Sequence, residues 1–250
     1  MNIVACIKRV PTTDLNPKLG PDNKHLDPQG VQYMVSFYDE IAVEEAVKTK
    51  EKHGGEVTVL TIGPAEGSKE VRECLAKGAD KAIILTDAHW TDRDAYTTAS
   101  LLKGQVEALG AEVVFCGRSA TDRDNATVGP MLASMLGWAC VTDVIELELE
   151  ADKGTAKREG DGGIENYSFS LPAVITCQKD LNEPRYAGLK GIMAAKKKKI
   201  EEIPAPELAG QSEILNLELP PARKEGRILG QGAAAVPALI EALQNEAKVL

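Results

Sequence analysis

Residues 56–85 read EVTVLTIGPAEGSKEVRECLAKGADKAIIL, and this stretch determines the fold. Glu56–Ile62 and Lys81–Leu85 are apolar runs of strand length, and Ser68–Lys77 between them has the character of a helix. A strand that is apolar on both faces needs cover on both faces, and a helical crossover between two such strands supplies part of that cover. The stretch therefore predicts two parallel strands joined by a helix.

The same alternation continues on both sides of this stretch. Further strands are predicted at Asn2–Ile7 and Glu112–Cys116, and further helices at Asp39–His53, Asp94–Leu109 and Asp124–Leu136. Gly110 follows the second of these helices, where a glycine commonly ends a helix. The predicted fold class is α/β, with a doubly wound, mainly parallel sheet.

The pattern changes after Trp138. Antiparallel additions to the sheet are predicted at Val141–Leu149, Gly154–Arg158, Tyr167–Leu171 and Ala173–Cys177. From Ile203 the chain becomes a coil rich in Pro and Glu, and a helix is predicted at Ala233–Lys248. We therefore expect an α/β domain over residues 1–202 and an extended arm over 203–250. The arm has little core of its own, so we expect it to pack on a partner subunit.

Composition excludes several classes of protein. The net charge is −9 and aromatic residues make up 4%, which argues against binding nucleic acid through phosphate contacts or base stacking. The five cysteines form no Cys-x-x-Cys pair and the three histidines share no ligand spacing, so no metal site is expected. Neither a signal peptide nor a membrane-embedded segment is expected, and the predicted location is cytoplasmic.

Ligands of open parallel sheets bind outside the carboxyl ends of the strands. Cys6–Val10, Ile62–Pro64 and Gly117–Gly129 (GRSATDRDNATVG) occupy that edge. The last segment leads into a predicted helix, whose free backbone N–H groups suit a nucleotide phosphate. Alternatively, Asp124 or Asn125 only caps that helix, and the spacing leaves both interpretations open.

No catalytic constellation emerges from the sequence. It contains no strained Gly-x-Ser-x-Gly turn and no phosphate-binding Gly-Lys-Ser loop. Gly230-Gln231-Gly232 superficially resembles a dinucleotide-binding fingerprint, but a charged coil precedes it and no strand–helix–strand unit follows. No catalytic residue is predicted, which favours a binding or carrier role in which a cofactor supplies the chemistry.

Leu181–Glu201 reads LNEPRYAGLKGIMAAKKKKIE and concentrates positive charge in an acidic chain. One interpretation is a solvated basic end on a short helix. The other is a docking loop, in which Leu189 enters an apolar groove of a partner and the lysines steer the approach.

This loop closely resembles the recognition loop of the electron-transfer flavoprotein beta-subunit family. The similarity extends to the segments CIKRV (Cys6–Val10), EIAVEEAV (Glu40–Val47), Gly63–Pro64, KGAD (Lys77–Asp80), REGDGGIE (Arg158–Glu165) and LPAVIT (Leu171–Thr176). The resemblance implies an adenine-nucleotide alpha-hydrolase-like fold and a heterodimer with an alpha subunit, whose mobile domain holds most of the redox-active FAD. Electrons would pass between flavin dehydrogenases, such as acyl-CoA dehydrogenases, and an acceptor such as a membrane quinone oxidoreductase.

The resemblance also implies the site residues. An adenine nucleotide in this subunit would contact Cys6, Ser36, Phe37, Tyr38, Asp39, Ile62, Gly117, Arg118, Ser119, Asp122, Asp124, Asn125, Ala126, Thr127 and Val128. Partner recognition would use Arg185, Leu189, Ile192, Met193, Lys196, Lys197, Lys198 and Lys199.

Some positions depart from the housekeeping members of that family. Ser36 stands where Asn is usual and Ile62 where Cys is usual, and Thr12 and Thr13 occupy the region of a Tyr beside the flavin. AMP, as in housekeeping members, is the first expectation for the nucleotide. A second FAD, as in electron-bifurcating members, is the alternative.

Two further classes compete with an electron-carrier subunit. A nucleotide-hydrolysing or adenylating enzyme would need an ATP-phosphate loop, which the sequence does not contain. A regulator that resembles universal stress proteins would not account for the loop that combines Leu189 with the lysine run, nor for the C-terminal arm.

Overall fold

The computed structural model describes residues 1–222 and 225–250. They form two compact units, Met1–Asn216 and Leu217–Leu250. The first unit contains a nine-stranded sheet with the order β11-β5-β4-β1-β6-β10-β7-β8-β9. Its strands are β1 (Asn2–Cys6), β4 (Glu56–Gly63), β5 (Lys81–Thr86), β6 (Val113–Gly117), β7 (Ala139–Leu149), β8 (Lys153–Gly160), β9 (Gly163–Ser170), β10 (Ala173–Cys177) and β11 (Ile200–Pro204). Each pair of neighbouring strands from β11 to β7 in this order is parallel. The pairs β7–β8 and β8–β9 are antiparallel.

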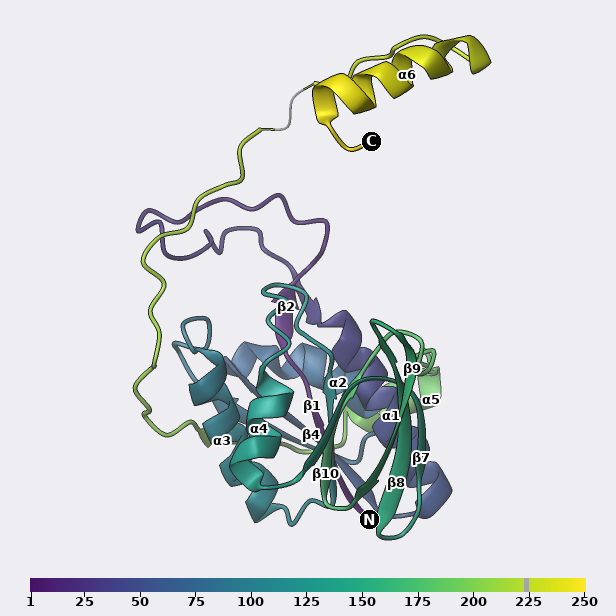
Figure 1. Ribbon diagram of the computed structural model, residues 1–250. Helices are drawn as coiled ribbons and strands as arrows, with labels where there is room; N and C mark the ends of the chain where they lie inside the picture. Colours follow the sequence, from purple (N-terminus) through teal and green to yellow (C-terminus); the bar gives the residue numbers. More distant parts are fainter. Residues whose placement is uncertain (223–224) are drawn as a thin grey trace. The chain divides into compact units, whose positions relative to one another are not determined.

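Helices cover both faces of this sheet (Figure 1). They are α1 (Phe37–His53), α2 (Ser68–Lys77), α3 (Ala95–Ala108), α4 (Val128–Leu136) and α5 (Leu189–Ala195), with a short 3-10 turn at Ala65–Gly67. The segments β2 (Arg9–Pro11) and β3 (Tyr33–Val35) form a separate antiparallel pair at the ends of the long loop after β1.

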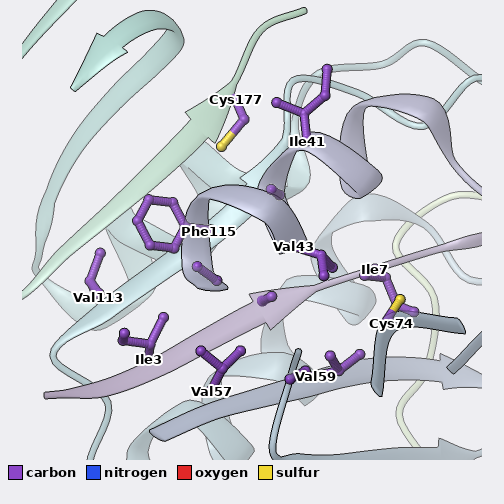
Figure 2. Close-up of a cluster of buried hydrophobic side chains, with 14 of the residues drawn as sticks. Ile3, Ile7, Ile41, Val43, Val57, Val59, Cys74, Val113, Phe115 and Cys177 are labelled. Atoms are coloured by element: carbon purple, nitrogen blue, oxygen red, sulfur yellow. The ribbon is translucent and has the colours of Figure 1, made fainter. Parts of the chain in front are cut away.

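The buried side chains fall into two clusters, one on each face of the sheet. Along β1, Ile3 and Ala5 join the cluster of α1 and α2, whereas Val4 and Cys6 join the cluster of α3 and α4. Figure 2 shows Ile3 in the first cluster with Val57, Phe115 and Ile41 of neighbouring elements. Burial on both faces is what the apolar strands predicted, and the doubly wound, mainly parallel α/β fold is confirmed.

The last predicted addition, Ala173–Cys177, was assigned the wrong direction. It forms β10, which pairs in parallel with both β6 and β7. All five of its residues are buried, as expected of an inner strand with α1 on one face and α4 on the other. The predicted strand at Val141–Leu149 belongs to β7, which also joins the sheet in parallel, on β10, and pairs antiparallel only with β8. The antiparallel ribbon is therefore β7–β8–β9, and β9 begins at Gly163, before the predicted Tyr167.

The helix predicted from Asp124 begins later, at Val128. Asp124 and Ala126 have φ values of 48° and 50°, which a right-handed helix does not contain. Thr127 occupies the N-cap position, without a side-chain hydrogen bond to the helix. The interpretation of Asp124 or Asn125 as the helix cap is therefore wrong.

The coil predicted from Ile203 begins after Pro204, because Ile200–Pro204 forms β11 beside β5. In the second unit, the predicted helix at 233–248 consists of the 3-10 turn Ala233–Ala235, helix α6 (Val236–Ala242) and a π-helical turn at Leu243–Ala247. None of the described helices combines the length and the apolar character needed to cross a bilayer. Packing of the arm on a partner stays a prediction.

Candidate functional site

A hollow lies outside the carboxyl ends of β1 and β6, where the strand order reverses. From β1 the chain proceeds to β4 and β5 on one side, then crosses to β6 on the other side. Such a switch point is where open α/β sheets bind ligands. The predicted residues that line the hollow are Cys6, Asp39, Ile62, Gly117, Arg118, Ser119, Asn125, Ala126, Thr127 and Val128.

The other predicted cleft residues do not line the hollow but support its walls. Ser36 Oγ accepts a hydrogen bond from the amide of Thr121 (3.2 Å), and Asp122 pairs with Lys8 Nζ (2.6 Å). Asp124 Oδ1 accepts a hydrogen bond from Ser119 Oγ (2.5 Å). The Tyr38 ring lies 5.7 Å from the Arg118 guanidinium carbon, and Phe37 packs edge-on against Tyr38 with ring centroids 5.3 Å apart.

Asp39, in the first turn of α1, joins the two sides of the switch point. Its Oδ2 accepts a hydrogen bond from the amide of Lys8 (2.7 Å), and its Oδ1 accepts one from the amide of Gly117 (2.9 Å). Burial raises the pKa of this carboxyl to about 7, although the two amides oppose the shift. A Cβ at position 117 would lie 2.4 Å from Asp39 Oδ1, so only glycine permits this close approach.

The loop before α4 offers donors for an anion. Within the described chain, the amides of residues 125–129 donate no hydrogen bond, and all five residues line the hollow. The left-handed conformations of Asp124 and Ala126 produce this irregular path. A non-glycine residue with positive φ is uncommon, and such strain is often retained at functional sites.

Basic side chains outnumber acidic ones around the hollow. The basic residues of its lining are Lys8, Arg93, Arg118 and Arg123, and the acidic residues are Asp39 and Asp94. Asp94 is already engaged, because it caps α3 through the amide of Thr97 (2.8 Å) and also accepts the amide of Ser212 (2.9 Å). Three of the basic side chains are paired as well, Lys8 with Asp122, Arg93 with Asp87 and Arg118 with Asp143. The lining therefore carries little unbalanced positive charge, and the free amides of residues 125–129 are the donors left for an anion.

Sequence reasoning missed the wall that follows β5. The connection from β5 to α3 and the first part of α3 supply Trp90, Arg93, Asp94, Ala95, Thr98 and Leu102. The predicted helix start at Asp94 was the signal that could have identified this wall, because a second helix N-terminus borders the hollow.

The β5–α3 connection is also tied to the long loop after β2. Trp90 packs edge-on against Tyr33, with ring centroids 6.0 Å apart. The His25 ring lies between Asp22 (2.6 Å from Nδ1) and Asp92 (2.5 Å from Nε2). Hydrogen bonding to these two carboxylates raises the pKa of His25. Through these contacts the ring joins the two loops.

Two thiols lie at the base of the hollow. Cys6 is the last residue of β1 and Cys116 is the next to last of β6, and both belong to the same buried cluster. A hydrogen bond with Cys6, followed by burial, raises the pKa of Cys116 well above its usual value. Both thiols present soft, polarizable surfaces to a ligand.

The docking segment adopts a different arrangement from the predicted loop. Leu189 is the first residue of α5 and is 78% exposed, and Ile192 and Met193 are also exposed. Lys198 Nζ, however, contacts the carbonyl groups of Leu75 and Ala79 at the end of α2. Lys196, Lys197 and Lys199 remain exposed, whereas Arg185 is paired within the chain.

Comparison with known proteins identifies the family. Residues 24–208 match the family model described as electron transfer flavoprotein domain. The chain is 34% identical over 259 residues to electron transfer flavoprotein subunit beta of Bacillus subtilis, with all of both chains covered. It is 39% identical over 224 residues to the subunit beta of Thermoanaerobacterium thermosaccharolyticum, covering 89% of this chain and 86% of that protein. It is 35% identical over 257 residues to the mitochondrial subunit beta of Oryza sativa subsp. indica, with both chains fully covered. The chain therefore belongs to the electron transfer flavoprotein beta-subunit family.

Proposed function

We propose that this chain is the non-catalytic half of a heterodimeric electron carrier. Its alpha subunit would hold most of the redox-active FAD, and the pair would move electrons between flavin dehydrogenases and an acceptor. Acyl-CoA dehydrogenases are the proposed donor class, and a membrane quinone oxidoreductase is the proposed acceptor class. The observation that carries the proposal is the hollow at the switch point, with the unpaired amides of residues 125–129.

The residues around the hollow fit an adenine nucleotide. The free amides of residues 125–129 and the N-terminus of α4 would hold a phosphate. Ile62, Leu102 and Val128 supply apolar wall for a base. AMP is the proposed ligand, with a second FAD as the alternative. A bound flavin would supply the electron transfer itself, and this chain's residues would bind and orient it.

The nucleotide content of the purified heterodimer tests this proposal. The complex is denatured, and the released nucleotides are separated and quantified. One FAD and one AMP per heterodimer are expected. Two FAD molecules would assign the protein to the electron-bifurcating class, and the absence of any nucleotide beyond a single FAD would refute the site.

The second element of the proposal is partner recognition by α5. Leu189, Ile192 and Met193 would enter an apolar pocket of a dehydrogenase, while Lys196, Lys197 and Lys199 would face an acidic rim. The exposure of these apolar side chains in an acidic protein supports it.

Replacing Leu189 with alanine is expected to slow electron transfer from the dehydrogenase. Burying one leucine contributes roughly 1.5–3 kcal/mol, or about one to two decades of affinity. Stopped-flow reduction of the flavin measures the loss, and Ile164→Ala, an exposed aliphatic residue of β9, is the control. Flavin content and heterodimer stability should stay unchanged. An unaltered rate for Leu189→Ala would leave this segment without a docking role.

We also propose a cytoplasmic location. All five cysteines are free thiols, which suits a reducing compartment.

A further inference from the structure

The segment before α5 is fastened to α1 by side chains that lie far apart in the sequence. Asn182 Nδ2 donates hydrogen bonds to the Ile41 carbonyl (3.1 Å) and to Glu45 Oε2 (2.9 Å). The backbone amide of Arg185 donates to Glu44 Oε2 (3.1 Å). The main chain immediately before the exposed residues is therefore held against the helix.

The Arg185 guanidinium is fully used by this attachment. Its Nε and Nη2 hold Glu44 at 2.9 Å and 3.0 Å, and its Nη1 and Nη2 hold Glu51 at 2.6 Å and 2.9 Å. The Glu44 side chain is only 5% exposed, and a buried carboxylate requires such a partner. Hydrogen bonds to Glu51 and then Glu44 raise the pKa of Arg185. Both edges of the planar group are occupied, so neither is left for a partner protein.

The other end of the segment is fastened to α2. Arg72 Nη1 donates a hydrogen bond to the Ala195 carbonyl at the end of α5 (2.8 Å). A Cβ at Gly191 would lie 2.3 Å from the Ala76 carbonyl oxygen, so α5 packs on α2 without space for a side chain there. Between these two attachments, Tyr186 is 98% exposed and Leu189 is 78% exposed.

We propose that Arg185, clamped by Glu44 and Glu51, is a positioning residue that preorganises Tyr186 and Leu189 for a partner without touching the partner itself. The inference rests on the proposed docking function of α5. Holding exposed side chains in the bound arrangement lowers the ordering cost of association. Arg185 thus fixes the conformation of the segment that carries Tyr186 and Leu189, although its sequence context suggested a cation that contacts the partner.

Glu51→Gln separates these two roles because they predict opposite signs. The substitution loosens one edge of the clamp, and it also exposes more of the positive charge of Arg185. A docking cation would then associate faster with an acidic partner, whereas a positioning residue would give slower association, by about threefold to tenfold. Glu148→Gln serves as the charge-matched control, because it removes the carboxylate of a separate exposed ion pair, between Glu148 of β7 and Lys52 of α1.

Arg185→Lys provides a second variant with the charge retained. Lysine keeps the charge but lacks the planar fork that holds two carboxylates at once. We expect it to slow association about as much as Glu51→Gln does. A rate equal to that of the native protein would overturn the positioning role.

The decisive measurement is a double-mutant cycle with Leu189→Ala. Flavin reduction in the intact heterodimer is followed by stopped flow at increasing concentrations of the dehydrogenase. If Glu51→Gln acts by positioning Leu189, its effect should largely disappear in the Leu189→Ala background. Independent, multiplicative losses, or faster association with Glu51→Gln alone, would overturn the proposal.

A partner-free readout keeps this inference distinct from the docking function. Chymotrypsin cleavage after Tyr186 in the native heterodimer should be several-fold faster in Glu51→Gln and Arg185→Lys than in Glu148→Gln. Unchanged cleavage in both clamp variants would refute the positioning role. An unchanged rate of flavin reduction in Leu189→Ala would instead refute the docking function on which the inference depends.

Discussion

Deleting residues 225–250 is expected to abolish assembly with the alpha subunit while leaving the α/β unit folded. In the second unit, the aliphatic side chains of α6 and of the flanking coil are exposed, among them Ile228, Val236, Leu239 and Ile240. The three residues on α6 are 43–48% exposed, so covering their remaining surface would contribute about 2–4 kcal/mol before ordering costs. An arm with this much exposed apolar surface needs a partner to cover it.

Sedimentation analysis of the co-expressed subunits measures this loss, and circular dichroism checks the fold of the shortened chain. A full-length variant with Val236, Leu239 and Ile240 all changed to serine is the matched control for chain length. It should assemble as poorly as the deletion. If the shortened chain forms the heterodimer with native affinity, the arm has no role in assembly.

Local patterns were sufficient to predict most of the elements. Helix α2 (Ser68–Lys77) has the predicted bounds, because its polar and apolar spacing and the flanking apolar strands are properties of the sequence itself. The direction of β10 was not predictable in this way, since pairing with β6 and β7 depends on distant segments. The start of α4 was missed because Ala126, with φ of 50°, belongs to a residue type that gives no sign of a left-handed conformation.

The site was predictable to the extent that strand ends define it. The rule for open parallel sheets located Gly117–Gly129 and Cys6 at the hollow. It did not locate Trp90 and Arg93, because their connection begins at β5, two strands away from β1, and reaches the hollow only through its length. The partners of Arg185 were equally hidden, since Glu44 lies 141 positions away in the sequence.

Replacing Asp39 with alanine is expected to destabilise the α/β unit more than any other single change at the hollow. It leaves the amides of Lys8 and Gly117 without their acceptor, and each unsatisfied buried group costs roughly 1–3 kcal/mol. The sum is about 2–6 kcal/mol when the carboxyl is protonated. Urea denaturation measures the loss, and Asp122→Ala is the control because it removes only a partly exposed ion pair with Lys8, worth about 1 kcal/mol or less.

The destabilisation caused by Asp39→Ala should become smaller as the pH rises. The pKa of Asp39 is raised from 3.8 to about 7 in the folded chain, chiefly by burial. Between these values the folded state keeps a proton that the unfolded state has released, so rising pH lowers the free energy of unfolding through this group. Asp39→Ala removes that dependence. The difference in unfolding free energy between the native protein and the variant should therefore shrink from about pH 4 to about pH 7 and then level off. A difference that is flat, or that rises only slightly near pH 4, would mean that Asp39 is ionised throughout this interval, with the two amides outweighing its burial.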